Sequence, residues 1–328
     1  MDAQNTIDGR PDPAVSICIP AHRRPRELRR AVASVLAQTA SDLEVIVTDD
    51  SGVRQELELE FGDSRLRYVL NPRPLGMAAN WQRGLSLARG RFIGLLMDDD
   101  RLLPSFVERC LAAFADDPTV GAVFTNHFFD DGRSLVARRS LLPDGTYDHF
   151  LPLLIRHKPV AICATLMRRD VWMGVLPVPD MHTADLAMHM RAAESGCIFR
   201  YVDEPLMIYS VHGGQLSGEP RFRHHNIALW RAFRFEYGSE EEALRRQRLA
   251  EALLSSAASR MQSGEVSLAA DLAREATALG VPVGQLTVRA RLIALLARSR
   301  AAAFVAGRAF RVAKGARLPR VRRGQERQ

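Results

Sequence analysis

The chain has 328 residues, of which 47% are hydrophobic and 25% are charged. This composition is typical of globular proteins and excludes a largely disordered chain, and the length suits one large domain or two modest ones. The polar start, together with apolar runs far shorter than the ~20 residues of a membrane span, predicts a cytoplasmic protein without signal peptide or span. The four cysteines are far apart and form no CxxC pair, which argues against a zinc site or a disulfide framework.

Positive charge is concentrated at the carboxy-terminal end. Residues 289–328 contain 12 lysines and arginines and one acid, a net charge of +11, so residues 1–288 carry −4 of the overall +7. The sequence therefore describes a mildly acidic body with a strongly basic tail. Nucleic acid is not the expected partner, because this tail carries no recognised binding motif.

Short apolar segments alternate with helical patterns through the first 126 residues. Strands are predicted at 14–20, 43–48, 66–70, 92–97 and 121–126, and helices at 25–36, 78–88 and 106–114. Strands that alternate with helices of this length form crossover units, which predicts an α/β fold with a mainly parallel sheet flanked by helices. Ligands bind to such sheets in the crevice beyond the carboxyl ends of the strands.

Two acidic runs follow apolar strands directly, Asp49-Asp50 and Asp98-Asp99-Asp100. Clustered carboxylates favour a cation, and their oxygens suit Mg²⁺ or Mn²⁺ shared with substrate phosphates. The sequence has neither a GxxxxGK[ST] loop nor a GxGxxG motif, so a metal is the expected means of holding a diphosphate. The alternative is an ordinary acidic turn, which is the interpretation we give to Asp116-Asp117 and Asp130-Asp131.

Motifs along residues 14–217 resemble, in order, those of the family 2 glycosyltransferases, which have the GT-A fold. The matching segments are Pro20-Ala21-His22-Arg23-Arg24-Pro25, Leu28 to Thr39, Glu44 to Gly52, Leu75 to Gly90, and Met97 to Asp100 with Pro104. Two further segments match downstream, Ala184-Asp185 with Arg191 and Gly196, and Tyr201 to Gly214.

The resemblance implies a role for each matching residue. Asp185 is the implied general base for the acceptor hydroxyl, with a helix cap as the alternative. Asp99 stands at the usual metal position and Asp98 or Asp100 assists it, while His212 binds the metal, touches the diphosphate or is structural. The implied nucleotide-sugar-binding residues are Pro20, His22, Arg24, Asp49, Asp50, Asn80, Asp98 and Asp99, and the implied metal ligands are Asp99, Asp100 and His212.

From about residue 221 the pattern becomes helical. Amphipathic helices are predicted at 227–235, 240–261, 266–279 and 288–312. The last is basic and amphipathic, which makes it a candidate for binding an anionic membrane surface, or alternatively a helix packed on the catalytic domain. The expected organisation is a disordered segment 1–13, a GT-A domain 14–220, a helical region 221–317 and a disordered basic tail 318–328.

The resulting prediction is a metal-dependent inverting glycosyltransferase of bacterial cell-surface polysaccharide or glycolipid synthesis. It uses Mn²⁺ or Mg²⁺, takes a hexosyl or deoxyhexosyl group from a nucleotide-diphosphate sugar and acts on a saccharide or lipid-linked acceptor. The basic helix would place it at the inner face of the plasma membrane. A sugar nucleotidyltransferase is a weaker alternative, because His22-Arg23-Arg24-Pro25 replaces the glycine-rich loop expected there. A non-catalytic binding or scaffold member of the same fold is the other alternative.

Overall fold

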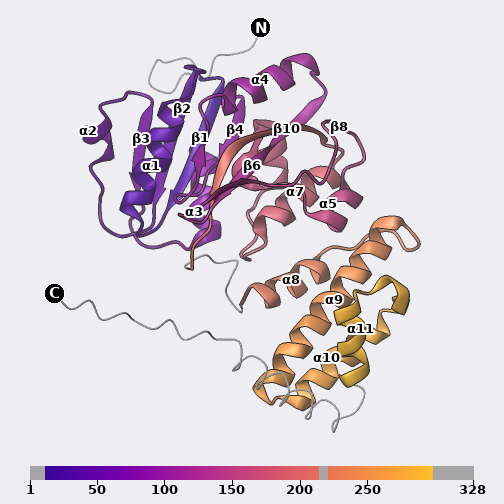
Figure 1. The fold of residues 1–328 in the computed structure, drawn as a ribbon. Coiled ribbons are helices and arrows are strands. Elements are labelled where there is room, and N and C mark those ends of the chain that lie inside the picture. Colours follow the sequence, from indigo (N-terminus) through magenta and orange to yellow (C-terminus); the bar gives the residue numbers. More distant parts are fainter. Residues whose placement is uncertain (1–11, 214–220, 298–328) are drawn as a thin grey trace, which may run out of the picture. The chain divides into compact units, whose positions relative to one another are not determined.

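The computed structural model describes residues 12–213 and 221–297 (Figure 1). The chain divides into two compact units, Met1–Glu219 and Pro220–Gln328. The predicted disordered segments 1–13 and 318–328 lie outside the described residues, apart from residues 12 and 13, and so does the predicted helix 288–312 beyond residue 297.

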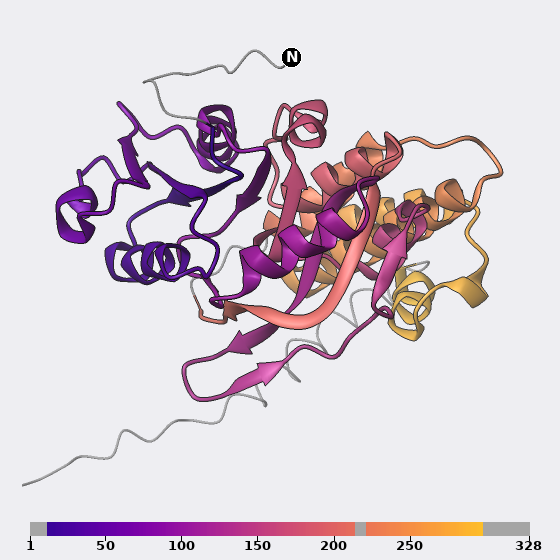
Figure 2. The same ribbon diagram turned by 90° about the horizontal axis from the view of Figure 1, so that it is seen from above.

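The first unit is built on one sheet (Figures 1 and 2). Its strands follow the order β3 (Leu66–Leu70), β2 (Leu43–Asp49), β1 (Val15–Ala21), β4 (Phe92–Leu95), β9 (Thr165–Arg168), β6 (Val120–Asp130), β10 (Ile198–Ser210) and β5 (Arg101–Leu102). Two strands lie off this path, β7 (Leu135–Ala137) beside β6 and β8 (Gly145–Tyr147) beside β10.

The strands predicted from the sequence are all present, and the first four are parallel to one another. The antiparallel β9 lies between β4 and β6, and β10 runs parallel to β6. Every residue of β1 and β2 is buried, as expected for apolar strands that helices cover on both faces.

The helices of this unit have the following bounds: α1 (Pro25–Leu36), α2 (Leu57–Phe61), α3 (Met77–Leu87), α4 (Phe106–Asp116), α5 (Leu151–His157), α6 (Arg169–Val175) and α7 (Ala184–Glu194). A short 3₁₀ helix, η1, spans Ile162–Ala164. Helix α1 begins with a proline at its first turn, and the apolar side chains at 28, 31, 32 and 35 form its buried face. Helices α1 and α3 both pack against β1 and β2, while α4 packs against β6 and β10.

The parallel register brings three strand ends to one edge. Ala21 at the end of β1 pairs with Asp49 at the end of β2, and Cys18 pairs with Leu95 at the end of β4. The acidic residues that follow β2 and β4 are therefore placed on either side of the turn that follows β1.

Within residues 221–297, the second unit has four helices, α8 (Arg221–Ala232), α9 (Glu240–Ser263), α10 (Val266–Ala278) and α11 (Val288–Ala297), with a 3₁₀ turn η3 at Val283–Gln285. Helix α8 begins and ends earlier than the predicted segment 227–235. Ser239 caps α9 by accepting a hydrogen bond from the Glu242 backbone N–H, and Gly264 ends the helix in the left-handed region, with φ 88°. Among the described residues, no helix is both long and apolar enough to cross a membrane.

Candidate active site

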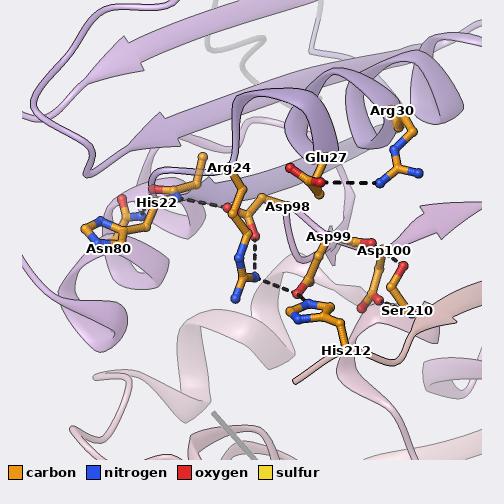
Figure 3. Close-up of polar contacts among 11 residues, drawn as sticks. His22, Arg24, Glu27, Arg30, Asn80, Asp98, Asp99, Asp100, Ser210 and His212 are labelled. Atoms are coloured by element: carbon orange, nitrogen blue, oxygen red, sulfur yellow. Dashed lines mark hydrogen bonds and ion pairs between the residues drawn. The ribbon is translucent and has the colours of Figure 1, made fainter. Parts of the chain in front are cut away.

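The turn between β1 and α1 faces the acidic triplet that follows β4. Arg23 adopts a left-handed φ of 56°, which costs a side-chain-bearing residue about 1–2 kcal/mol. On one side of it, the His22 backbone N–H donates to Asp98 Oδ2 over 2.9 Å. On the other side, Arg24 extends from the start of α1 between Asp98 and Asp99 (Figure 3). The strained turn thus aims two donors at the triplet.

Asp98 is a buried carboxylate that relies on these donors. Its Oδ1 accepts from Arg24 Nη1 at 3.2 Å, while its Oδ2 is held by His22. Burial raises the pKa of Asp98 to about 6, and the His22 N–H and the Arg24 charge only partly oppose that rise. A cation beside Asp98 therefore stabilises its ionised form.

Asp99 joins Arg24 to the segment that follows β10. Its Oδ2 accepts from Arg24 Nη1 at 2.5 Å and lies 2.9 Å from His212 Nε2. The Asp99 side chain is 10% exposed, whereas those of Arg24 and His212 are 31% and 37% exposed. The carboxylate is therefore fixed in the wall of the site, and its two partners reach it from the solvent side.

Asp100 faces away from Arg24, towards β10. Its Oδ1 accepts from the Ser210 backbone N–H at 2.9 Å, and the buried Cys163 thiol also donates to it. Burial raises the pKa of Asp100 to about 7, and the neighbouring charge of Asp99 adds to this rise. Ser210 Oγ donates in turn to the Asp99 carbonyl at 2.5 Å. Asp100 thus anchors the triplet to β10. Sequence reasoning assigned no role to Cys163 and placed Ser210 only within a matching segment, because both contact Asp100 only in the folded chain.

The residues at the triplet suit a divalent cation that takes its remaining ligands from substrate phosphates. Among the described residues, no group of three histidine, cysteine or acidic side chains is arranged to hold a metal ion. Asp99 and His212 are adjacent, however, and carboxylate and imidazole are both ligands for such ions. Mg²⁺ and Mn²⁺ sites commonly combine one or two protein ligands with substrate phosphates. Asp99 and His212 would hold the ion, with Asp98 beside it, whereas Asp100, the third implied metal ligand, is turned towards Ser210.

The second acidic pair is enclosed by protein hydrogen bonds. Asp50 accepts from Asn71 Nδ2 at 2.7 Å and from the backbone N–H groups of Leu75 and Gly76 at 2.8–2.9 Å. Asp49 accepts from the Tyr68 hydroxyl at 2.6 Å. Both aspartates are less than 5% exposed. Asp50 holds the loop before α3, whereas Asp49 holds Tyr68 of β3. Sequence reasoning assigned no role to Tyr68 or Asn71, because their partners Asp49 and Asp50 lie about 20 residues away along the chain.

The remaining nucleotide-site candidates lie at the same edge of the sheet. His22 Nδ1 lies 3.2 Å from the Asp50 carbonyl oxygen, which links the two acidic runs. Asn80 is buried and donates to the Thr48 carbonyl at 3.0 Å and to that of Ala21 at 3.4 Å. Pro20 is buried within β1, opposite Thr48. Asn80 and Pro20 therefore support the strand ends, while His22 and Arg24 face the triplet.

Asp185 lies on a separate element, in the first turn of α7. Burial raises its pKa, which the Leu186 N–H and the positive charge of Lys158 partly oppose. One turn later, the buried His189 ring donates to the Asp185 carbonyl oxygen, and burial lowers the pKa of His189 to about 4. Arg191 Nη1 donates to the carbonyls of Val175 and Pro177 and so fixes the loop that leads into α7. The arrangement presents a carboxylate that takes up a proton more readily than an ordinary aspartate.

Comparison with known proteins identifies the first unit. Residues 16–173 match the family described as Glycosyl transferase family 2, a range that includes both acidic runs and ends before Asp185 and His212. The chain is 35% identical over 150 residues to a chondroitin synthase of Pasteurella multocida (strain Pm70), covering 44% of this chain and 15% of that protein. It is 23% identical over 205 residues to the Escherichia coli UDP-Glc:alpha-D-GlcNAc-diphosphoundecaprenol beta-1,3-glucosyltransferase WfaP, covering 62% of this chain and 79% of WfaP. The chain thus spans only a small part of the first of these relatives.

Two solved structures share the architecture. Staphylococcus aureus TarS 1–349, in complex with UDP-GlcNAc, superposes with a TM-score of 0.65 at 16% identity, covering 92% of this chain and 91% of TarS 1–349. The mannosyltransferase PcManGT from Pyrobaculum calidifontis, in complex with GDP-Man and Mn²⁺, has a TM-score of 0.54 at 16% identity, covering 92% of this chain and 87% of PcManGT. At this identity the likeness establishes the fold, including the helical region that follows the sheet.

Proposed function

The chain carries a glycosyltransferase family 2 domain with the GT-A fold, and from this premise we propose that it transfers a sugar from a nucleotide-diphosphate donor to an acceptor hydroxyl. The observation that carries the proposal is the arrangement of Asp98, Asp99, Arg24 and His212 at the carboxyl edge of the sheet. This arrangement combines buried carboxylates with two partly exposed side chains, Arg24 and His212. Such a combination suits a site for a cation and a diphosphate.

The donor's diphosphate is the group that this site is suited to bind. A divalent cation at Asp99 and His212 would supply Lewis-acid stabilisation of the negative charge on the departing nucleoside diphosphate. The Arg24 guanidinium can contact phosphate oxygens through two parallel N–H donors. Buried Asp50 holds the loop before α3 and buried Asp49 holds Tyr68 of β3, and we assign the nucleoside to that side of the site.

Asp185 is our candidate general base. A carboxylate oxygen of Asp185 takes the proton of the acceptor hydroxyl while the hydroxyl oxygen attacks the anomeric carbon. The bond between that carbon and the diphosphate oxygen breaks in the same displacement, so the transferred sugar has inverted anomeric configuration. The raised pKa of Asp185 supports this role, because a base whose pKa lies nearer the working pH accepts a proton more effectively.

The comparisons support the substrate class at a coarse level. TarS was solved with UDP-GlcNAc and PcManGT with GDP-Man and Mn²⁺, while WfaP is named for a diphosphoundecaprenol-linked acceptor. We therefore propose transfer of a hexosyl or deoxyhexosyl group to a saccharide or lipid-linked acceptor in bacterial surface polysaccharide or glycolipid synthesis, with Mn²⁺ or Mg²⁺ as cofactor.

We place this activity in the cytoplasm, at the inner face of the plasma membrane. Helix α11 supports that position, because Leu292 and Leu295 are exposed on it beside Arg291. Exposed leucines next to arginine suit a surface of anionic lipid.

Replacing the candidate base tests the proposal. The full chain is incubated with Mn²⁺, a panel of UDP-, GDP- and dTDP-sugars and a diphosphoundecaprenol-linked GlcNAc acceptor, and release of the nucleoside diphosphate is followed. We expect Asp185→Asn to lower turnover by about 10²–10⁴-fold while nucleotide affinity is retained.

Asp180→Asn is the matched control, because Asp180 is an exposed aspartate in the loop before α7. We expect it to keep full turnover, and NMR of the wild-type product should show inverted configuration. Wild-type turnover unchanged by Asp185→Asn, or a product of retained configuration, would contradict the assignment of the base.

A further inference from the structure

We propose that Arg24 is an exchangeable counter-ion, which pairs with Asp98 and Asp99 before loading and moves to the donor's diphosphate when the cation binds. This inference rests on the proposed function and makes it more specific. It predicts that cation and nucleotide diphosphate help each other to bind, and that Arg24 is the residue that couples them.

The first support is the position of the Arg24 guanidinium. Nη1 lies 3.2 Å from Asp98 Oδ1 and 2.5 Å from Asp99 Oδ2, so a single nitrogen bridges the two carboxylates (Figure 3). A cation shared by these aspartates would occupy the same space. Arginine is neither a metal ligand nor deprotonated in proteins, so it has to leave before such an ion can bind there.

The second support is the difference in burial between the partners. The side chains of Asp98 and Asp99 are 7% and 10% exposed, whereas that of Arg24 is 31% exposed. Arg24 lies at the amino-terminal boundary of α1, after the left-handed Arg23, and donates to the carboxylates from the open side. The carboxylates are buried, and the Arg24 guanidinium is the more exposed partner in both of its ion pairs.

The third support is charge. Two buried carboxylates need a positive partner, and Arg24 supplies one as long as no metal does. A divalent cation at Asp99 repels the guanidinium, and the negative diphosphate that accompanies the ion attracts it. A guanidinium forms bidentate hydrogen bonds to phosphate as well as to carboxylate, so Arg24 exchanges one anionic partner for another.

This exchange has a thermodynamic signature. While Arg24 remains on the carboxylates, Mn²⁺ binds weakly, and a nucleotide diphosphate that draws Arg24 away strengthens Mn²⁺ binding. By linkage, Mn²⁺ strengthens nucleotide binding by the same factor. A cation that the diphosphate itself helps to hold also couples the two ligands, so the part of the coupling that depends on Arg24 is the decisive quantity. If Arg24 belonged only to a structural ion pair, its removal would neither improve metal binding nor reduce the coupling.

The test measures Mn²⁺ binding to the full chain by electron paramagnetic resonance of the free ion, alone and with saturating UDP, GDP or dTDP. For Arg24→Gln we expect Mn²⁺ alone to bind about tenfold more tightly than to wild type, and the gain caused by nucleotide to shrink about tenfold. Arg24→Lys retains the charge without the bidentate geometry. Its Mn²⁺ affinity and its gain from nucleotide should both lie between those of wild type and Arg24→Gln.

Arg29→Gln is the matched control, because it removes the same charge from α1 at a surface ion pair with Glu60. It should leave both quantities unchanged, and circular dichroism melting verifies that each variant is folded. If nucleotide strengthens Mn²⁺ binding as much in Arg24→Gln as in wild type, or if that variant binds Mn²⁺ more weakly than wild type, the role of Arg24 is overturned. The proposed function would not be affected by either result. A wild-type chain that binds none of the three nucleotides with Mn²⁺ would overturn the proposed function together with it.

Discussion

Three consecutive aspartates after β4 occupy three different environments. Asp98 faces the turn after β1, Asp99 lies between Arg24 and His212, and Asp100 is turned towards Ser210. Because each loses water to a different degree and gains different donors, burial raises the pKa of Asp98 to about 6 and that of Asp100 to about 7. The sequence predicted an acidic cluster here but left open which aspartate does what, since the partners are up to 113 residues away along the chain.

A second residue-scale feature is His189, a neutral histidine one turn after the candidate base Asp185 on α7. His189 is 1% exposed, and its Nε2 has no hydrogen-bond partner among the described residues. Its pKa is about 4 in the folded chain and 6.5 when unperturbed, so the unfolded chain binds the proton more tightly. The stability that this group contributes is therefore present above about pH 6.5 and is lost as the pH falls towards 4.

His189→Leu should remove this acid sensitivity. Between pH 7 and pH 5, we expect the free energy of unfolding of wild type to fall by about 2 kcal/mol more than that of the variant. Urea unfolding at a series of pH values measures the difference. Parallel pH profiles for the two proteins would show that His189 is not held neutral by the fold.

At the scale of elements, the sequence predicted strands β1 to β4 and β6, and it did not predict β5 or β7 to β10. The residues of β1, β2 and β4 form apolar runs bounded by turn residues, which a search for buried strands detects. Strand β9 has only four residues and follows a 3₁₀ turn, and β5 has two, so neither has a periodicity of its own. Both form because neighbouring strand edges pair with them, which is tertiary information.

The turn between α3 and β4 shows how closely these elements approach. A Cβ atom added to Gly90 would lie 2.5 Å from the Ser16 backbone nitrogen and 2.7 Å from the Val15 carbonyl carbon. The Gly90 N–H donates to Ser16 Oγ, and Ser16 Oγ donates to Glu44. Because these contacts are to backbone atoms, the added methyl group cannot be accommodated by rotation of a side chain.

Gly90→Ala should therefore destabilise the first unit by about 1–3 kcal/mol. Gly174→Ala in α6 is the control, because nothing lies within 4 Å of its added Cβ and alanine favours a helix by about 1 kcal/mol. Denaturant unfolding should move the two variants in opposite directions. Equal stability of Gly90→Ala and wild type would mean that the strand and the turn are not in close contact.

At the scale of the whole molecule, the chain joins a unit whose residues 16–173 match glycosyltransferase family 2 to a unit whose described residues form helices. The motifs of the first unit made its fold predictable, and the TM-score of 0.65 to TarS 1–349, over 92% of this chain, confirms the prediction of a GT-A fold followed by helices. The second unit is held by alanine- and leucine-rich helix contacts and by a buried ion pair between Arg245 and Glu242. Its role stays a prediction, because helical periodicity predicts helices without indicating what they bind.

We propose that the first unit binds a nucleotide-diphosphate sugar through a cation at Asp99. The most direct measurement is calorimetric titration of the full chain with UDP, GDP and dTDP and their sugars, with and without Mn²⁺, for wild type, Asp99→Asn and Asp116→Asn. Asp116 is an exposed aspartate at the end of α4 and serves as the control. We expect one nucleotide class to bind wild type and Asp116→Asn at least about tenfold more tightly with Mn²⁺, and this gain to be lost in Asp99→Asn. Binding that is independent of Mn²⁺, or no nucleotide binding at all, would contradict the claim.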